Sequence, residues 1–132
     1  MPLSITQAQA FLNSLLGSGA PATWYMALYF TEPSPSGGGT EMSGDTYARV
    51  ALTNNNTNFT GATATSPSVV NNGTAITFAT PGTNWGTIGF WGLCSSSSGG
   101  SPTWFGSFAA PLVIISGNPV VISAGNLNLS LG

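Results

Sequence analysis

The chain contains 132 residues, of which four are charged, and it has neither lysine nor histidine. An average soluble domain carries charge on roughly a quarter of its residues. With a single arginine and a formal net charge of −2, the chain lacks the basic surface that binds phosphates or anionic lipids, so we expect neither nucleic acid nor a membrane as a partner. The usual acids, bases and nucleophiles of catalysis are nearly absent as well, so we expect no enzymatic activity and no cofactor.

The length predicts a single domain over residues 1–132, long enough to bury a hydrophobic core. Cys94 is the only cysteine, so no intrachain disulfide can form, and we expect a small buried side chain at this position. The N-terminal residues show neither a basic start nor a long apolar run, which predicts no signal peptide and no membrane-spanning helix. We therefore expect synthesis in the cytoplasm.

The first predicted element is an amphipathic helix over residues 4–16. Ser4 to Gln7 have the form of a capping box, and Gly17 is placed to end the helix. Apolar side chains follow at helical spacing, namely Ile5, Ala8, Phe11, Leu12, Leu15 and Leu16. Because this apolar face is extensive for a helix on a small domain, we expect it to dock on the core or on a neighbouring subunit.

Residues 23–30 predict a central strand, because apolar side chains occupy both of its faces. Residues 31–46 predict a long loop, since the run Glu-Pro-Ser-Pro-Ser-Gly-Gly-Gly favours neither helix nor strand. Turn-forming residues, with Asn72-Gly73 as a strong signal, then separate several short segments of strand character. These predicted strands are residues 47–53, 75–79, 87–93, 103–108, 112–115, 119–123 and 127–131. The order predicts a mainly β fold, an antiparallel β-sandwich or jelly roll with one N-terminal α-helix.

Three carboxylates, those of Glu32, Glu41 and Asp45, fall within the predicted loop, and Arg49 follows it. A calcium ion would need about six to eight oxygen ligands, and this spacing matches no defined calcium-binding loop. The stronger interpretation is a structural ion pair of Arg49 with Asp45 or Glu41, because a partly buried arginine in a nearly uncharged chain needs a partner. We therefore expect no metal site.

The tryptophans allow two interpretations. Trp24, Trp85, Trp91 and Trp104 could stack on sugar rings, as in carbohydrate-binding modules. Each lies within or beside a predicted strand, however, where a large aromatic side chain more often belongs to a core or an interface. Together with the predicted helix, this gives four candidate assembly contacts, which are Leu12, Leu15, Trp24 and Trp104.

Two segments resemble known proteins. Residues 39–50 read Gly-Thr-Glu-Met-Ser-Gly-Asp-Thr-Tyr-Ala-Arg-Val, and residues 24–33 read Trp-Tyr-Met-Ala-Leu-Tyr-Phe-Thr-Glu-Pro. Both are similar to segments of small virion structural proteins of tailed bacteriophages, a group that includes capsid decoration, minor structural and tail-fibre proteins. The resemblance covers most of the chain, continuing through residues 71–78, 84–93, 104–108 and 119–131. At residues 95–100 this chain has serine and glycine where those proteins carry acidic residues.

The resemblance implies a non-enzymatic role in the virion. We expect a capsid decoration (cement) protein on the capsid surface, which binds the major capsid protein and itself, as a homotrimer, and stabilises the assembled shell. The alternative is a tail-fibre or baseplate component, which could contact a host glycan. A polysaccharide-cleaving module is a third interpretation, but the chain lacks two positioned carboxylates outside the predicted loop.

Overall fold

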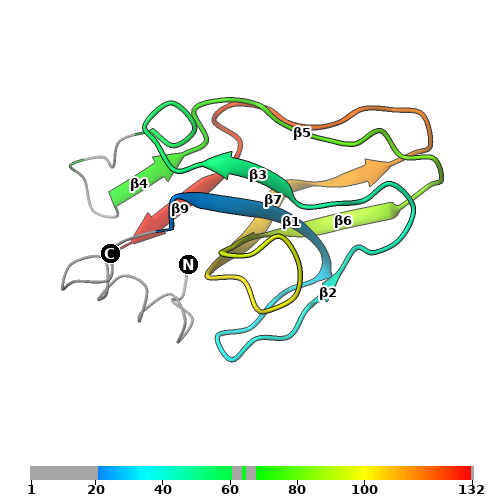
Figure 1. Ribbon diagram of the computed structural model, residues 1–132, viewed down its shortest axis with the longest axis horizontal. Helices are drawn as coiled ribbons and strands as arrows, with labels where there is room; N and C mark the ends of the chain where they lie inside the picture. The colour runs from blue at the N-terminus through cyan, green and yellow to red at the C-terminus, as the bar shows by residue number, and fades with distance from the viewer. Residues whose placement is uncertain (1–20, 61–63, 65–67, 132) are drawn as a thin grey trace.

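The computed structural model describes residues 21–60, 64 and 68–131, and every structural statement below refers to these residues. They form nine β-strands and no helix (Figure 1). The strands are β1 (Thr23–Thr31), β2 (Thr40–Glu41), β3 (Val50–Thr53), β4 (Ser68–Asn71), β5 (Ile76–Phe78), β6 (Gly86–Cys94), β7 (Trp104–Ile114), β8 (Val120–Ile122) and β9 (Asn128–Leu131). Their pairings are antiparallel, so the prediction of a mainly β, antiparallel fold is confirmed. The helix predicted over residues 4–16 lies outside the described residues.

β1 is an inner strand of a five-stranded sheet with the order β2-β1-β6-β7, in which β3 also pairs with β1. Met26, Ala27 and Leu28 are fully buried, as the apolar residues on both faces of this segment predict. The register between β6 and β7 shifts between Ile88 and Phe90. Extra residues of β7 bulge out opposite this point, and such a bulge bends a strand. The sequence predicts two strands here, residues 103–108 and 112–115. In the structure they form one bent strand, β7.

β2 and β3 lie end to end along one edge of β1. β3 pairs with the first residues of β1 and β2 with its last residues, while residues 42–49 between them leave the edge and return to it. The loop predicted over residues 31–46 is therefore wrong in part, because β2 lies inside it. Two backbone hydrogen bonds between Ser34 and Gly37, of 2.8 and 2.9 Å, close a tight turn that brings β2 back beside β1.

Opposite this sheet, β4 pairs with β9 and β5 with β8, and Asn72 joins these two ribbons. The Asn72 side chain is buried, and its Nδ2 donates to the carbonyl oxygens of Thr74 and Ser123, each at 3.0 Å. The side-chain Oδ1 accepts from the Leu127 N–H at 2.9 Å, and the backbone carbonyl oxygen of Asn72 accepts from the Gly125 N–H at 2.9 Å. Asn72 thus supplies cross-strand bonds where the two ribbons meet. The sequence predicts a turn here but no strand at β4, whose residues belong to an Asn-, Thr- and Ser-rich stretch.

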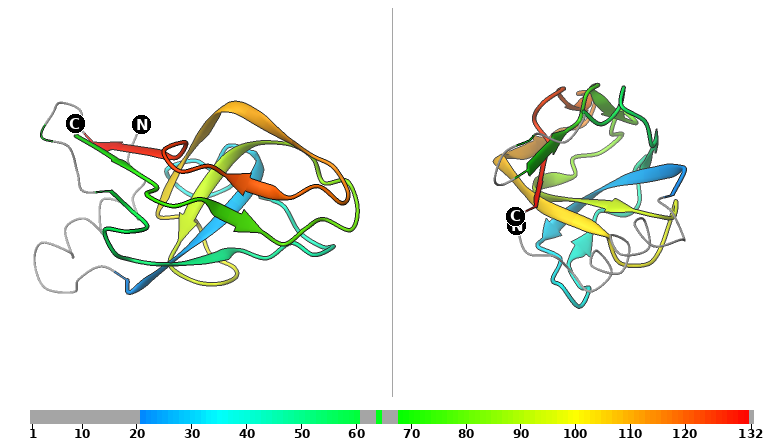
Figure 2. Two further views of the ribbon diagram at one scale, coloured as in Figure 1. Left: turned by 90° about the horizontal axis from the view of Figure 1, so that it is seen from above. Right: turned by 90° about the vertical axis from the view of Figure 1, so that its left-hand side faces the viewer.

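The main hydrophobic core lies between the five-stranded sheet and the ribbons. It takes side chains from one face of β1 and β6, from the end of β7, and from β5, β8 and β9. The right-hand view of Figure 2 shows the ribbon strands on one side of the sheet. A smaller buried cluster, made of Ala27, Tyr29 and Cys94, lies on the opposite face of the sheet. The predicted burial of Cys94 is confirmed, since its side chain is 1% exposed.

We expect Asn72→Ala to lower the free energy of unfolding by about 1–3 kcal/mol for each buried backbone group that it leaves unpaired. The Leu127 N–H and the Ser123 carbonyl oxygen both lose this partner in the variant. Chemical denaturation followed by tryptophan fluorescence measures the change. Asn56→Ala is the control because Asn56 is exposed. Equal destabilisation by the two substitutions would contradict the role of Asn72 in joining the ribbons.

Candidate functional site

Three charged residues, Glu41, Asp45 and Arg49, hold loops in place. No three acidic, histidine or cysteine side chains among the described residues form a group that could hold a metal ion. No helix in this part is long and apolar enough to cross a membrane. Glu41 and Asp45 take different partners, and Glu32 is exposed. The three carboxylates therefore form no shared site.

Arg49 and Glu41 form a two-pronged ion pair at the interrupted edge of the sheet. Arg49 Nη2 donates to Glu41 Oε1 at 2.7 Å, and Arg49 Nε donates to Glu41 Oε2 at 2.8 Å. Arg49 Nη1 donates to the carbonyl oxygens of Ser96 and Gly99, at 2.9 and 3.0 Å. The arginine side chain is 2% exposed and the glutamate side chain 25%. Arg49 therefore fastens the serine-rich loop over residues 95–101 to the edge of the sheet.

The Tyr47 hydroxyl connects this ion pair to the backbone of β1. It accepts a hydrogen bond from the Leu28 N–H at 3.1 Å and donates one to Glu41 Oε2 at 2.6 Å. Met42 N–H in turn donates to the Leu28 carbonyl oxygen at 2.9 Å. Leu28 lies between the part of β1 that pairs with β3 and the part that pairs with β2. The tyrosine hydroxyl thus takes the place of a backbone acceptor in the gap of the ladder.

The ionisation states follow from these contacts. Burial raises the pKa of Glu41, but hydrogen bonds from Arg49 and Tyr47 outweigh it and hold this pKa below its ordinary value. The hydrogen bond to Glu41 raises the pKa of Arg49. Burial, together with the hydrogen bond to Glu41, raises the pKa of Tyr47. At neutral pH the pair is therefore charged and the tyrosine keeps the proton that it donates.

Cys94 belongs to the smaller buried cluster, on the face of the sheet opposite the main core. Its Sγ is 3.8 Å from the Tyr29 hydroxyl, and both side chains are buried. Burial raises the pKa of the Cys94 thiol, so the thiol is neutral at physiological pH. The residue acts as a small core side chain.

Asp45 does not pair with Arg49, which corrects one of the two predicted ion pairs. Asp45 Oδ2 accepts from Trp85 Nε1 at 2.9 Å, from the Gly82 N–H at 2.8 Å and from the Thr83 N–H at 3.2 Å. Its backbone has a positive φ of 49°, in the left-handed region that aspartate tolerates better than most residues. The hydrogen bond from Trp85, helped by those from the two backbone N–H groups, lowers the pKa of Asp45 to about 2.

Asp45 binds the loop over residues 81–84, and this loop holds the turn between β7 and β8. The Gly117 N–H donates to the Pro81 carbonyl oxygen at 2.9 Å. Ser116 donates through its N–H to Asn84 Oδ1 at 2.8 Å and through its hydroxyl to the Gly82 carbonyl oxygen at 3.0 Å. Each of these bonds links residues more than 30 positions apart in the sequence. The turn is therefore fixed by contacts with a distant loop.

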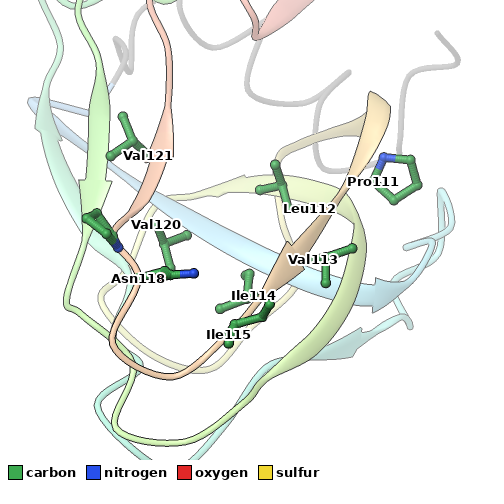
Figure 3. A pocket seen from close by; sticks show the side chains of 9 residues that line it. Pro111, Leu112, Val113, Ile114, Ile115, Asn118, Val120 and Val121 are labelled. Carbon is green, nitrogen blue, oxygen red and sulfur yellow. The ribbon is translucent and has the colours of Figure 1, made fainter.

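Beside this turn, β7 and β8 present an apolar surface to solvent. Val113, Ile115 and Val121 are 68%, 47% and 41% exposed, and Val113 and Val121 point to opposite sides of the two strands (Figure 3). They line a groove of about 200 Å³ between the two strands (Figure 3). Its other lining residues are Pro111, Leu112, Ile114, Asn118, Pro119 and Val120. The sequence predicts strands over residues 112–115 and 119–123 but not the exposure of these aliphatic side chains. The signal is that residues 112–115 are all apolar, so both faces of this strand are apolar.

A family model described as podophage GP4 fiber I protein gp80 matches residues 2–130. The chain belongs to this family. The resemblance to virion structural proteins of tailed bacteriophages is thereby confirmed. No curated protein matches the chain.

The four residues predicted as assembly contacts of this gp80-family chain do not form one surface among the described residues. Leu12 and Leu15 lie outside the described residues. Trp24 is 8% exposed in the main core, and Trp104 is partly buried against the same core. Trp24 thus offers little surface to a partner and Trp104 only part of its side chain. Trp85 and Trp91 are buried as well, which leaves little tryptophan surface for stacking on a sugar.

We expect Arg49→Ala to lower the free energy of unfolding by about 3 kcal/mol, the lower end for breaking a buried pair, because Glu41 keeps some exposure to solvent. Arg49→Lys should recover only part of this loss, since an ammonium group cannot reproduce the planar, two-pronged contact. Denaturant titration gives the energies, and amide hydrogen exchange follows residues 95–101. Wild-type stability of Arg49→Ala would show that the arginine does not hold this loop.

Asp45 makes a contribution to stability that acid removes. Its pKa in the folded chain, about 2, lies below the ordinary value of 3.8, so the contribution is complete above pH 3.8 and is lost as the pH falls toward 2. We expect Asp45→Asn to lower the melting temperature at neutral pH and to weaken its decline in this acidic range. Circular dichroism melting curves measure both effects. Glu32→Gln, which changes an exposed carboxylate, is the control, and identical pH profiles for the two variants would contradict the role of Asp45.

Proposed function

We propose that the chain is a structural subunit of a fibre on a tailed-phage virion. The family match carries this proposal, because it spans residues 2–130 and its description names a fibre protein. The description favours the tail-fibre alternative over capsid decoration. In this proposal the chain is not an enzyme and needs no cofactor.

The architecture of the described residues supports a role in assembly. Three charged side chains, those of Glu41, Asp45 and Arg49, are engaged in bonds that hold loops. The two layers around the main core support an antiparallel sandwich, a frame that large assemblies commonly use. The exposed side chains of Val113, Ile115 and Val121 add apolar surface to this frame. We further propose a homotrimer that contacts another virion protein.

Capsid decoration is the second candidate. The segment over residues 39–50 resembles head decoration proteins as well as tail-fibre proteins, and a small charge-poor subunit can bind a repeating shell through apolar and backbone contacts. In that role the partner is the major capsid protein and the location is the outer surface of the capsid.

Immunogold electron microscopy of virions, with antibodies raised against the recombinant chain, tests the two roles. The fibre role predicts label on appendages and a copy number far below that of the major capsid protein on a stained gel. Label spread over the shell, with a copy number comparable to that of the major capsid protein, would replace the fibre role with decoration. Particles that carry none of the chain would overturn both.

A further inference from the structure

We propose that Asn72 is a deamidation site that the unfolded chain exposes and the fold closes. In the unfolded chain Asn72 is converted to aspartate or isoaspartate, and neither product can join the two ribbons as asparagine does. The time that a chain spends unfolded therefore limits how much of it can still fold. This property of the chain does not depend on its position in the virion.

The pair Asn72-Gly73 is the one place in the sequence where glycine follows asparagine. Glycine in this position favours deamidation, because it has no side chain to keep its backbone nitrogen away from the asparagine amide. The packing requires the glycine, since a Cβ atom at Gly73 would collide with the Thr57 carbonyl oxygen. The ribbons require the asparagine, whose amide joins them. The reactive pair therefore cannot be replaced without disturbing the fold.

The reaction needs only water. The Gly73 backbone nitrogen attacks Cγ of Asn72, the bond from Cγ to Nδ2 breaks, and ammonia leaves with the proton that the nitrogen has lost. Water then opens the resulting succinimide ring at either of its carbonyl carbons. Opening at Cγ gives aspartate, and opening at the backbone carbon of Asn72 gives isoaspartate, in which the main chain runs through the side chain. Nothing is oxidised or reduced.

The folded chain holds both reacting groups in place. The Gly73 N–H donates to the Asn58 carbonyl oxygen at 2.7 Å, so the attacking nitrogen is kept protonated and bonded. Asn72 is 1% exposed, and three hydrogen bonds to backbone groups hold its amide. These bonds must break before Cγ is free to meet the Gly73 nitrogen. Reaction in the folded chain thus requires local opening, which is rare at a buried site.

Either product disrupts the junction where it forms. In aspartate an oxygen replaces Nδ2 and faces the carbonyl oxygens of Thr74 and Ser123, with no proton between them at neutral pH. The new negative charge is buried without a cation, because Arg49 is the one basic residue of the chain and pairs with Glu41. Isoaspartate also lengthens the main chain at the point where the ribbons meet. A deamidated chain therefore loses the bonds that join the ribbons.

Mass spectrometry of the full 132-residue chain, incubated at neutral pH in buffer and in guanidinium chloride that unfolds it, tests the inference. Deamidation changes the mass by the difference between a hydroxyl and an amino group, and sequencing of proteolytic peptides locates it. We expect the unfolded chain to react first at Asn72. The folded chain should react there at least about a hundredfold more slowly, because only its open fraction reacts.

A synthetic peptide of residues 70–75 is the control for the solvent, since it gives the effect of guanidinium chloride on the reaction itself. Once this effect is subtracted, equal rates at Asn72 in the two solvents would overturn the inference. So would deamidation of the unfolded chain that spreads evenly over its asparagines. After dilution into buffer, the fraction of wild type that refolds should fall in step with the fraction deamidated at Asn72.

Asn72→Asp reproduces the aspartate product, and Asn56→Asp makes the same chemical change at an exposed position. We expect Asn72→Asp to lower the folding equilibrium constant by at least about a hundredfold, or to prevent folding, and Asn56→Asp to leave this constant nearly unchanged. Denaturant titration followed by tryptophan fluorescence compares the two. Wild-type stability of Asn72→Asp would show that deamidation does not trap the unfolded chain.

Discussion

The ion pair between Arg49 and Glu41 compensates for the break between β2 and β3. An edge strand that leaves its neighbour exposes a backbone N–H, here that of Leu28, and an unpaired buried N–H costs about 1–3 kcal/mol. The Tyr47 hydroxyl accepts a hydrogen bond from this N–H and donates one to the Glu41 carboxylate. Because Arg49 fixes that carboxylate and also binds two carbonyl oxygens of the serine-rich loop, one cation organises both the broken edge and the loop.

The excursion over residues 42–49 therefore serves two parts of the molecule. Tyr47 and Arg49 hold it to the sheet edge, while Asp45 reaches the opposite loop that contains Gly82 and Trp85. That loop in turn fixes the turn after β7. The ring of Tyr47 also packs edge-on against Trp85 with 5.6 Å between ring centroids, so the two networks are in contact. In a chain with four charged residues, three of them thus determine loop positions.

Local sequence patterns predict those features that depend on neighbouring residues. The inner strand β1 and the mainly antiparallel β fold follow from alternation and from turn residues. The partner of Asp45 does not, because Asp45 and Trp85 are 40 positions apart and no local pattern records such a contact. β4 is missed for a similar reason, since its two valines stand in a stretch rich in Asn, Thr and Ser and form a strand through pairing with β9. The exposure of Val113 is missed because a run that is apolar on both faces looks the same whether one face or both are buried.

The turn after β7 carries no charge, and its geometry depends on a loop more than 30 positions away in the sequence. Three hydrogen bonds join this turn to the loop over residues 81–84, and a fourth runs from the Asn118 N–H to the Ile115 carbonyl oxygen. Asp45 fixes that loop through N–H groups that would otherwise need water. Asp45 thus acts on an uncharged turn indirectly, by fixing the loop that holds it.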